Sequence, residues 1–266
     1  MSRWRSSPVV ASPPVAAYDV VIPARDEAGT VGAVVRAARG AAGVGAVLVV
    51  DDGSADGTAD AARAAGAVVI TARPPGAPAG DKGRALATGV AAARADVLVF
   101  FDADLAGAGP AHFEALAAPV LAGACALSCL LDYGRLRNPL FLRLPPITGL
   151  RALPRAVFEA VAPARRNGFQ IEIMLNEVVA RGRLPSRIRV LRGLTHRSKV
   201  EKAGWARGAR AHLAMTAELL GCLRTVPLWT YGAYLRRLEV LPPAGPGAPR
   251  SGPPRSAEGA VEAPDA

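Results

Sequence analysis

Two aspartates one residue apart, Asp102 and Asp104, follow the apolar run at 97–101. A buried strand there would deliver both carboxylates to the carboxyl end of a sheet, where open α/β sheets bind ligands. Two oxygen ligands, with positions left for water and substrate, suit a hard divalent cation such as Mg²⁺ or Mn²⁺ that also contacts substrate phosphates. The pair alone also occurs by chance in loops, so its meaning depends on the segments around it.

Two further strand ends carry polar residues. The apolar run at 47–50 is followed by Asp51 and Asp52, and the run at 18–22 ends at Pro23. Lys82 lies in a Gly-bounded loop after a Pro-rich segment, and such a loop could close over a ligand. These strand ends and this loop give the Asp102–Asp104 pair the surroundings of a ligand site.

The chain from 19 to 131 alternates short β-rich runs with helical stretches, which predicts an α/β fold: a mainly parallel sheet with helices on both faces. Strands are expected near 19–23, 46–50, 67–71, 97–101 and 124–131, and helices near 30–39, 56–65, 82–93 and 110–121.

The pattern changes after residue 131 to a basic, Pro-containing connection. We expect helices around 155–161 and from about 169, a strand near 188, and a C-terminal helical extension formed by helices at 200–221 and 226–238. The organisation would be a flexible arm (1–17), a first half that holds the ligand site (18–131), a second, C-terminal helical half of the same domain (132–240), and a disordered tail (241–266).

Composition excludes several classes. The chain has 266 residues, 51% of them hydrophobic, which is ample for a core, and its three cysteines point to a reducing compartment. We expect no signal peptide and no spanning helix, hence a cytoplasmic protein.

Residues 133–237 hold 20 Lys and Arg against 5 Asp and Glu. That segment could contact the inner face of a membrane or an anionic substrate, or simply be solvated. Its C-terminal helix carries apolar and aromatic residues that could lie on a membrane surface, or else cap the domain: Leu228, Trp229, Tyr231, Tyr234 and Leu235. No nucleic-acid-binding module is recognised.

Four sequence blocks together point to a family. They are 21–27, 50–58, 81–83 and 102–105, and they occur in the order and spacing of the GT-A fold glycosyltransferases of family 2, which the chain resembles from about 19 to 196. The resemblance implies a Rossmann-like GT-A fold, a nucleoside diphosphate sugar such as a UDP- or GDP-sugar as donor, and a divalent cation, Mg²⁺ or Mn²⁺, as cofactor.

The resemblance also assigns donor residues. Pro23 and Glu27 match the loop that lies against base and ribose, and Asp52 looks like the carboxylate that accepts from the base N–H. An ionised carboxylate accepts hydrogen bonds only, which suits a pyrimidine imide. Lys82 would meet the diphosphate or the base pocket. The alternative for 51–58 is a turn with a helix N-cap.

Asp102 and Asp104 resemble the metal motif of the family. Asp104 would be the direct ligand, with a catalytic role, and Asp102 would reach the ribose or the metal. Ala106 stands where some relatives have Gln, so a third ligand must come from elsewhere. His196 is the candidate, because relatives that include the glucosyl-3-phosphoglycerate synthases supply a histidine from beyond the core sheet; the alternative is a surface histidine.

Two later blocks, 146–153 and 168–172, look like acceptor-side and sugar-side elements. Thr148, Gly149 and Arg151 would bind the sugar or the acceptor. Glu172 would bind donor hydroxyls or act as general base, unless it is only a favourable first-turn residue. The acceptor would be anionic: a polyprenyl phosphate or membrane lipid, for which arginines 135, 137 and 143 would pair with the phosphate, or a small phosphorylated or carboxylated molecule.

The sequence thus predicts a metal-dependent glycosyltransferase, with peripheral membrane contact and a homodimer both left open. A nucleotidyltransferase is one rival, although its usual Gly-rich phosphate loop after the first strand is missing. A non-catalytic nucleotide- or membrane-binding relative is another. A dinucleotide oxidoreductase is disfavoured, because no G-x-G-x-x-G follows a strand.

Overall fold

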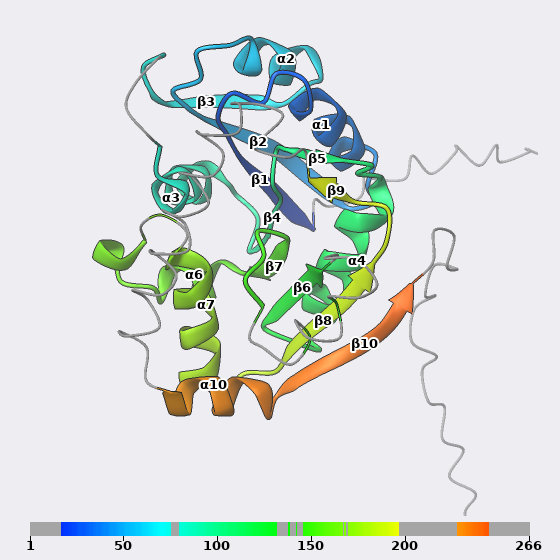
Figure 1. Ribbon diagram of the computed structural model, residues 1–266, viewed down its shortest axis with the longest axis vertical. Coiled ribbons are helices and arrows are strands. Elements are labelled where there is room, and N and C mark those ends of the chain that lie inside the picture. Colours follow the sequence, from blue (N-terminus) through cyan, green and yellow to red (C-terminus); the bar gives the residue numbers. More distant parts are fainter. Residues whose placement is uncertain are drawn as a thin grey trace, which may run out of the picture.

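The computed structural model describes residues 17–75, 80–131, 138, 142, 146–166, 168, 170–196 and 228–244. In this part of the chain an eight-stranded sheet lies between two layers of helices (Figure 1). The strand order is β10-β8-β6-β7-β4-β1-β2-β3, and a second, two-stranded sheet pairs β5 with β9.

The first half follows the predicted alternation. Its elements are β1 (Tyr18–Ala24), α1 (Val31–Arg39), β2 (Val44–Asp52), α2 (Thr58–Ala64), β3 (Val68–Arg73), α3 (Lys82–Ala92), β4 (Val97–Phe100), β5 (Leu105–Ala106), α4 (Pro110–Leu121) and β6 (Leu127–Leu131). The second half contains β7 (Arg151–Pro154), α6 (Arg155–Glu159), the 3₁₀ turn η1 (Pro163–Arg165), α7 (Gln170–Arg181), β8 (Ser186–Leu191), β9 (Thr195–His196), α10 (Leu228–Leu235) and β10 (Leu238–Ala244).

The central strands β1, β4 and β6 are almost entirely buried on both faces, as their near-continuous apolar runs predict for a parallel sheet. Side chains alternate along β1: Val20 and Ile22 pack in the core beneath α1 and α4, whereas Val21 packs in the core beneath α3, α6 and α7. Figure 1 shows α1 and α4 on one side of the sheet and α3, α6 and α7 on the opposite side. The chain therefore has the expected three-layer α/β architecture.

Strand direction decides which chain ends meet. β1, β2, β4, β6 and β8 pair parallel to their neighbours in this set, while β7 pairs antiparallel with both β4 and β6. Phe100, the last residue of β4, is therefore opposite Arg151, the first residue of β7. The residues just before β7 consequently lie at the same edge of the sheet as those just after β4.

The carboxyl-terminal region differs from the expectation. The helix predicted at 226–238 is present as the shorter α10, and the chain then forms β10, parallel to β8, instead of entering a disordered tail at 241. Pro242 argues against a strand by local rules, but β10 is at the end of the sheet, where prolines are tolerated. The predicted arm 1–16, the helix at 200–221 and the remaining tail 245–266 lie outside the described residues.

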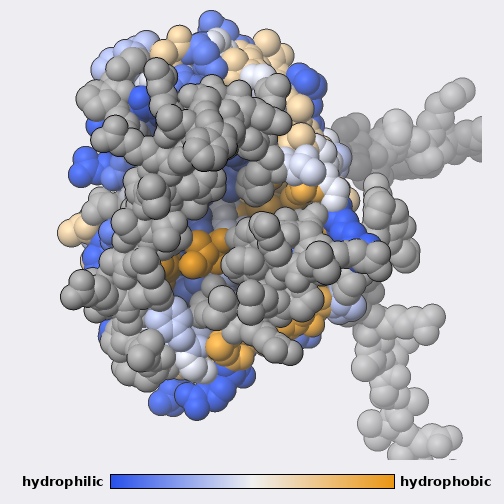
Figure 2. All heavy atoms as spheres, in the orientation of Figure 1, coloured by the Kyte–Doolittle hydropathy of each residue, from blue (hydrophilic) through white to orange (hydrophobic). Residues whose placement is uncertain are grey.

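No helix in the described part of the chain reaches the length and apolarity needed to cross a bilayer. The large hydrophobic side chains that are exposed lie on separate elements: Val68, Leu121, Ile147, Leu235 and Val240. In Figure 2 hydrophilic residues line the rim of the face that is drawn, with a smaller hydrophobic group near its centre. Tyr234, one of the aromatics expected to touch a membrane, is instead 2% exposed and packs in the core.

Candidate active site

Asp52 ends β2 at the carboxyl edge of the sheet and is nearly buried. One of its carboxylate oxygens accepts a hydrogen bond of 2.7 Å from the backbone N–H of Asp81, and the other lies 3.8 Å from Nε of Arg73. Arg25 donates to its backbone carbonyl at 3.1 Å. Burial raises the pKa of the Asp52 carboxyl, and the Asp81 N–H and the two guanidiniums offset this effect only in part.

The loops after β1 and β2 are tied together by side-chain hydrogen bonds. The N–H of Asp26 donates to Ser54 Oγ at 3.0 Å, and the N–H of Glu27 donates to Thr58 Oγ1 at 2.7 Å. Asp26 adopts a positive φ of 54°, a conformation that a short polar residue tolerates. Pro23 and Glu27 are thereby held beside the 52–58 loop, whose Ser54 and Thr58 hydroxyls accept these hydrogen bonds.

Lys82 begins α3 and contacts two carboxylates. Its Nζ lies 2.8 Å from Asp102 and 2.9 Å from Glu172, and all three side chains are at most 20% exposed. Burial alone would lower the pKa of Lys82, but the two carboxylates outweigh burial and raise it above its ordinary value. Lys82 is therefore a fixed cation between the strand end of β4 and the first turn of α7.

Gly149 is packed against Asp102. A Cβ atom at position 149 would overlap the Asp102 carboxylate, so only glycine permits this approach. The contact follows from the antiparallel direction of β7, which returns the turn at 148–149 to the end of β4. The structure thus brings together the metal motif and the acceptor-side turn that the sequence singled out separately.

Asp104 is half-buried and directly precedes β5. β5 pairs antiparallel with β9, in the register Leu105 opposite His196. The backbone of His196 is therefore next to that of Leu105, the residue directly after Asp104. His196 and Leu105 are 91 positions apart in the sequence. Among the described side chains, which do not include that of His196, no group of three or more His, Cys, Asp or Glu is placed to hold a metal ion.

Arg151 is 1% exposed, and its surroundings differ from those of an anion-binding arginine. It donates to the carbonyls of Pro146, Thr148 and Glu172 at 2.6, 2.6 and 3.1 Å, and to Oδ1 of Asn176 at 2.9 Å. Four of its five donors are thus used inside the protein. Arg151 joins the 146–148 turn to the first turns of α7 and does not present its charge to an acceptor.

Thr148 is also held by internal bonds. Its hydroxyl donates to the carbonyl of Leu130 at 3.1 Å and accepts from the N–H of Leu150 at 3.2 Å. The hydroxyl thus anchors the turn on β6. A ligand at this turn would consequently contact its backbone and Gly149.

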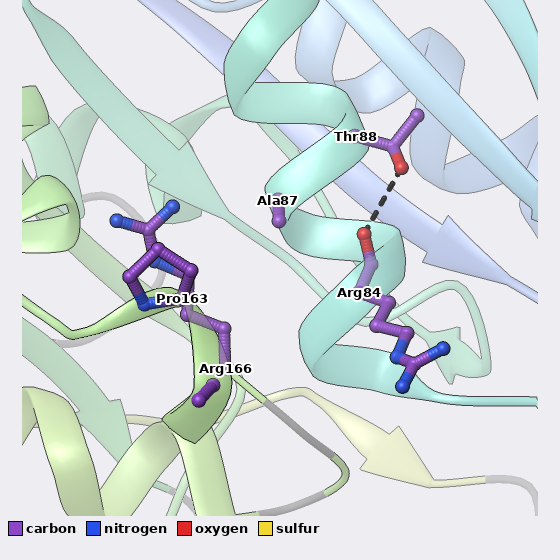
Figure 3. Close-up of a pocket in the computed structure, with 6 residues that line it drawn as sticks. Arg84, Ala87, Thr88, Pro163 and Arg166 are labelled. Atoms are coloured by element: carbon purple, nitrogen blue, oxygen red, sulfur yellow. Dashed lines mark hydrogen bonds between the residues drawn. The ribbon is translucent and has the colours of Figure 1, made fainter.

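A pocket of about 640 Å³ lies apart from these residues, between α3 and the segment at 163–166 (Figure 3). Arg84, Thr88 and Arg166 line it, but Arg84 pairs with Asp81, and Arg166 donates to the carbonyls of Val161 and Glu159. None of the predicted site residues lines this pocket.

Sequence reasoning missed several residues of the site. Arg25 and Arg73 flank Asp52, Asn176 holds Arg151, and Asp81 bonds to Asp52 through its backbone. Asp81 carried a usable signal, because an aspartate directly before a helix is a favoured N-cap. The other three gave none, since their partners are distant in the sequence.

The mostly parallel sheet, the helices on both faces and the carboxylates at its edge define a GT-A fold. Residues 19–143, somewhat under half of the chain, match the model of Glycosyl transferase family 2. The recognised family is the one that the four sequence blocks resemble.

Two curated relatives are similar over just under half of the chain. The chain is 35% identical over 125 residues to a glucosyl-3-phosphoglycerate synthase of Mycolicibacterium paratuberculosis, covering 45% of this chain and 38% of that protein. A protein of the same name from Mycolicibacterium smegmatis is 35% identical over 123 residues, covering 44% of this chain and 41% of that protein. The chain thus matches about two fifths of the length of these relatives.

Solved structures resemble a larger part of the chain. A glucosyl-3-phosphoglycerate synthase from Mycobacterium tuberculosis, in complex with Mn²⁺, UDP and glucosyl-3-phosphoglycerate, has a TM-score of 0.61 and 25% identity, covering 81% of this chain and 80% of that one. A complex of that enzyme with Mn²⁺, UDP-glucose and phosphoglyceric acid has a TM-score of 0.56 and 27% identity, covering 69% and 72%.

Proposed function

We propose that this protein is a metal-dependent glycosyltransferase that moves glucose from UDP-glucose to a small anionic acceptor of the phosphoglycerate type. The observation that carries the proposal is the contact of Lys82 with both Asp102 and Glu172, on segments that join the donor half to the acceptor half. The family match of residues 19–143 and the ligands of the M. tuberculosis structures support it.

The donor residues suit a uridine nucleotide. The Asp52 carboxylate offers hydrogen-bond acceptors to the imide N–H of uracil. Its hydrogen bond from Asp81 fixes the carboxylate before any ligand arrives. Arg25 and Arg73 add positive charge beside it, which favours an anionic nucleotide.

The donor set at the end of β4 fits Mg²⁺ or Mn²⁺. Asp104 and Asp102 supply oxygens, and the β5–β9 pairing brings the His196 backbone to the same segment. A carboxylate pair with one imidazole is an acceptable ligand set for Mn²⁺. When bound, such an ion supplies Lewis-acid stabilisation of the charge on the leaving UDP.

The chain's own residues would complete the site. The Lys82 ammonium would also contact the donor diphosphate, since it is a compact positive charge with three hydrogen-bond donors. Glu172, at the start of α7, would accept hydrogen bonds from sugar hydroxyls, or take the proton of an attacking acceptor hydroxyl. The Gly149 turn, whose backbone lies against Asp102, would contact the sugar or the acceptor.

The acceptor is assigned to the small anionic class because the solved relatives contain phosphoglyceric acid or its glucosylated product. The polyprenyl-phosphate alternative is less supported, because Tyr234 of α10 is buried against α7 and does not face a membrane. Arginines 135, 137 and 143 lie outside the described residues. Peripheral membrane contact, a homodimer and cytoplasmic localisation stay predictions.

The test is a turnover assay with UDP-glucose, 3-phosphoglycerate and Mn²⁺, in which UDP release is measured and the product is weighed by mass spectrometry. A product heavier than the acceptor by one hexose unit, lost on adding EDTA, is expected. Parallel reactions with GDP- and dTDP-glucose and with a polyprenyl phosphate test the named donor and acceptor. Turnover only with the lipid phosphate would overturn the acceptor assignment, and nucleotidyl transfer would overturn the class.

A further inference from the structure

Asp81 contacts three parts of the site through its backbone N–H and one carboxylate oxygen. Its backbone N–H donates to Asp52 at 2.7 Å, at the end of β2. Its side-chain Oδ1 accepts from the N–H of Arg84 at 3.1 Å, which caps α3. The same oxygen accepts from the N–H of Gly168 at 2.7 Å, 87 residues away and two residues before α7. A simple helix cap would need only the second of these bonds.

The residues on either side of these bonds are the ones that bear charge in the site. Lys82 follows Asp81 directly, and Glu172 is four residues after Gly168. Lys82 and Glu172 contact each other at 2.9 Å. The Asp81–Gly168 hydrogen bond and the Lys82–Glu172 ion pair therefore join the same two segments at two adjacent points.

The approach of this segment to Asp52 is close. A Cβ atom at position 80 would overlap Oδ2 of Asp52, so Gly80 allows the chain to pass over the carboxylate. The Asp81 side chain is 25% exposed, which leaves its bonds to Gly168 and Arg84 partly shielded from water. The start of α3 is thus fixed on one side to the nucleotide half and on the other to the loop before α7.

We propose that the Asp81 carboxylate is a positioning group, which holds the loop before α7 against the start of α3 and so keeps Lys82 in register with Asp102 and Glu172. This inference rests on the proposed function for its catalytic consequence. Asp81 does not touch the reacting atoms; it acts through Lys82 and Glu172. A displacement of about 1 Å at such groups can cost on the order of 10²-fold in rate.

Three variants at this position separate the positioning role from the cap. Asp81→Ala removes the acceptor for both N–H groups but keeps the backbone bond to Asp52. Asp81→Asn keeps a carbonyl oxygen of the same reach. Asp81→Ser restores a good N-cap through a shorter side chain. Asp60→Ala is the matched control, since Asp60 also lies in the first turn of a helix but is 88% exposed and pairs only locally with Arg63.

The readouts are kcat and KM for UDP-glucose, thermal stability, and the rate at which an amine reagent labels Lys82, followed by mass spectrometry. We expect Asp81→Ala to lower kcat roughly 10- to 100-fold and to raise Lys82 labelling several-fold. Asp81→Asn should restore both. Asp81→Ser should recover thermal stability but not kcat or the protection of Lys82, and Asp60→Ala should match the wild type.

Two results would overturn the positioning role: unchanged kcat and Lys82 labelling in Asp81→Ala, or full recovery of both by Asp81→Ser, which would reduce Asp81 to a helix cap. If the wild type does not use UDP-glucose, the proposed function fails, and the labelling of Lys82 still decides the structural part. Protection lost in Asp81→Ala and regained in Asp81→Asn supports the inference in that case.

Discussion

The ammonium nitrogen of Lys82 lies 2.8 Å from a carboxylate oxygen of Asp102, and the same nitrogen lies 2.9 Å from Glu172. One cation thus pairs with two acidic side chains, one just after β4 and one in the first turn of α7. Each of these carboxylates would otherwise face the other across a poorly solvated space, which is costly for like charges.

Replacing Lys82 by Met should therefore destabilise the fold, because it leaves the two carboxylates buried without a cation. Breaking a buried pair in this way costs about 3–5 kcal/mol, although the partial exposure of Asp102 and Lys82 reduces that figure. The free energy of unfolding from urea titration checks the prediction. Arg63→Met is the matched control, since the Arg63–Asp60 pair is exposed and should contribute about 0.5 kcal/mol or less.

The double variant Lys82→Met with Glu172→Gln should recover part of this loss. Removing one of the two carboxylates relieves their repulsion, so the effects of the single variants should fail to add by about 1–3 kcal/mol. Strictly additive free energies of unfolding would show that the two side chains do not interact in solution.

Gly149→Ala should abolish or strongly reduce turnover, because the added Cβ would displace the Asp102 carboxylate. The expected loss is on the order of 10²-fold for a misplaced catalytic group. Gly232→Ala is the control: nothing lies within 4 Å of a Cβ at that helical position. That variant should keep its activity and gain up to about 1 kcal/mol of stability. Wild-type kinetics in Gly149→Ala would contradict the close packing.

Asp52→Asn should weaken nucleotide binding while stabilising the fold at neutral pH. Burial raises the pKa of the Asp52 carboxyl, so this group favours the folded state below its unfolded pKa, and that contribution is lost as pH rises through the folded pKa. The stability of Asp52→Asn relative to the wild type should consequently increase as pH rises above the ordinary value of 3.8.

Urea titrations of Asp52→Asn and the wild type between pH 3 and pH 7 measure this trend, and calorimetry with UDP measures the affinity. Loss of a hydrogen bond to a charged acceptor should cost about 1.5–3 kcal/mol of binding. A variant less stable than the wild type at pH 7 would show that Arg25 and Arg73 outweigh the cost of burial.

His196→Ala should alter the metal requirement without unfolding the protein. The backbone of His196 pairs with β5, and alanine keeps that pairing, whereas the imidazole is lost. We expect the Mn²⁺ concentration for half-maximal turnover to rise about 10-fold or more, since losing one ligand of a metal site weakens it. An identical Mn²⁺ titration would return His196 to an ordinary loop residue.

The first half of the fold could be predicted because its signals are local. Apolar runs at 47–50 and 97–101 are typical of buried strands, and the boundaries between helices and strands fall where turn residues gather. β5 and β9 were missed, because strands of two residues have no periodicity to detect. β10 was missed because Pro242 cannot donate a hydrogen bond to a neighbouring strand, and proline is therefore tolerated only in edge strands.

The sequence singled out candidate site residues one by one, but it did not predict the contacts between them. Asp52, Lys82, Asp102 and Glu172 stand out by type and by their place after strands or before helices. The pairing of Lys82 with Glu172 spans 90 residues and depends on how α3 and α7 pack on the sheet. Arg151 was expected to meet an anion; its burial under the 146–148 turn follows from tertiary contacts that the sequence pattern does not contain.

The most direct measurement is the thermal unfolding of the wild type and of Asp104→Ala with UDP-glucose, each with and without Mn²⁺. For the wild type we predict that donor and Mn²⁺ together stabilise the fold by about 2.7 kcal/mol when the donor is at 100 times its dissociation constant. Mn²⁺ should add nothing to the donor effect in Asp104→Ala, whose metal site is incomplete. No stabilisation of the wild type by UDP-glucose with Mn²⁺, or an equal metal-dependent shift in Asp104→Ala, would contradict the assignment of this edge of the sheet as a metal-dependent nucleotide-sugar site.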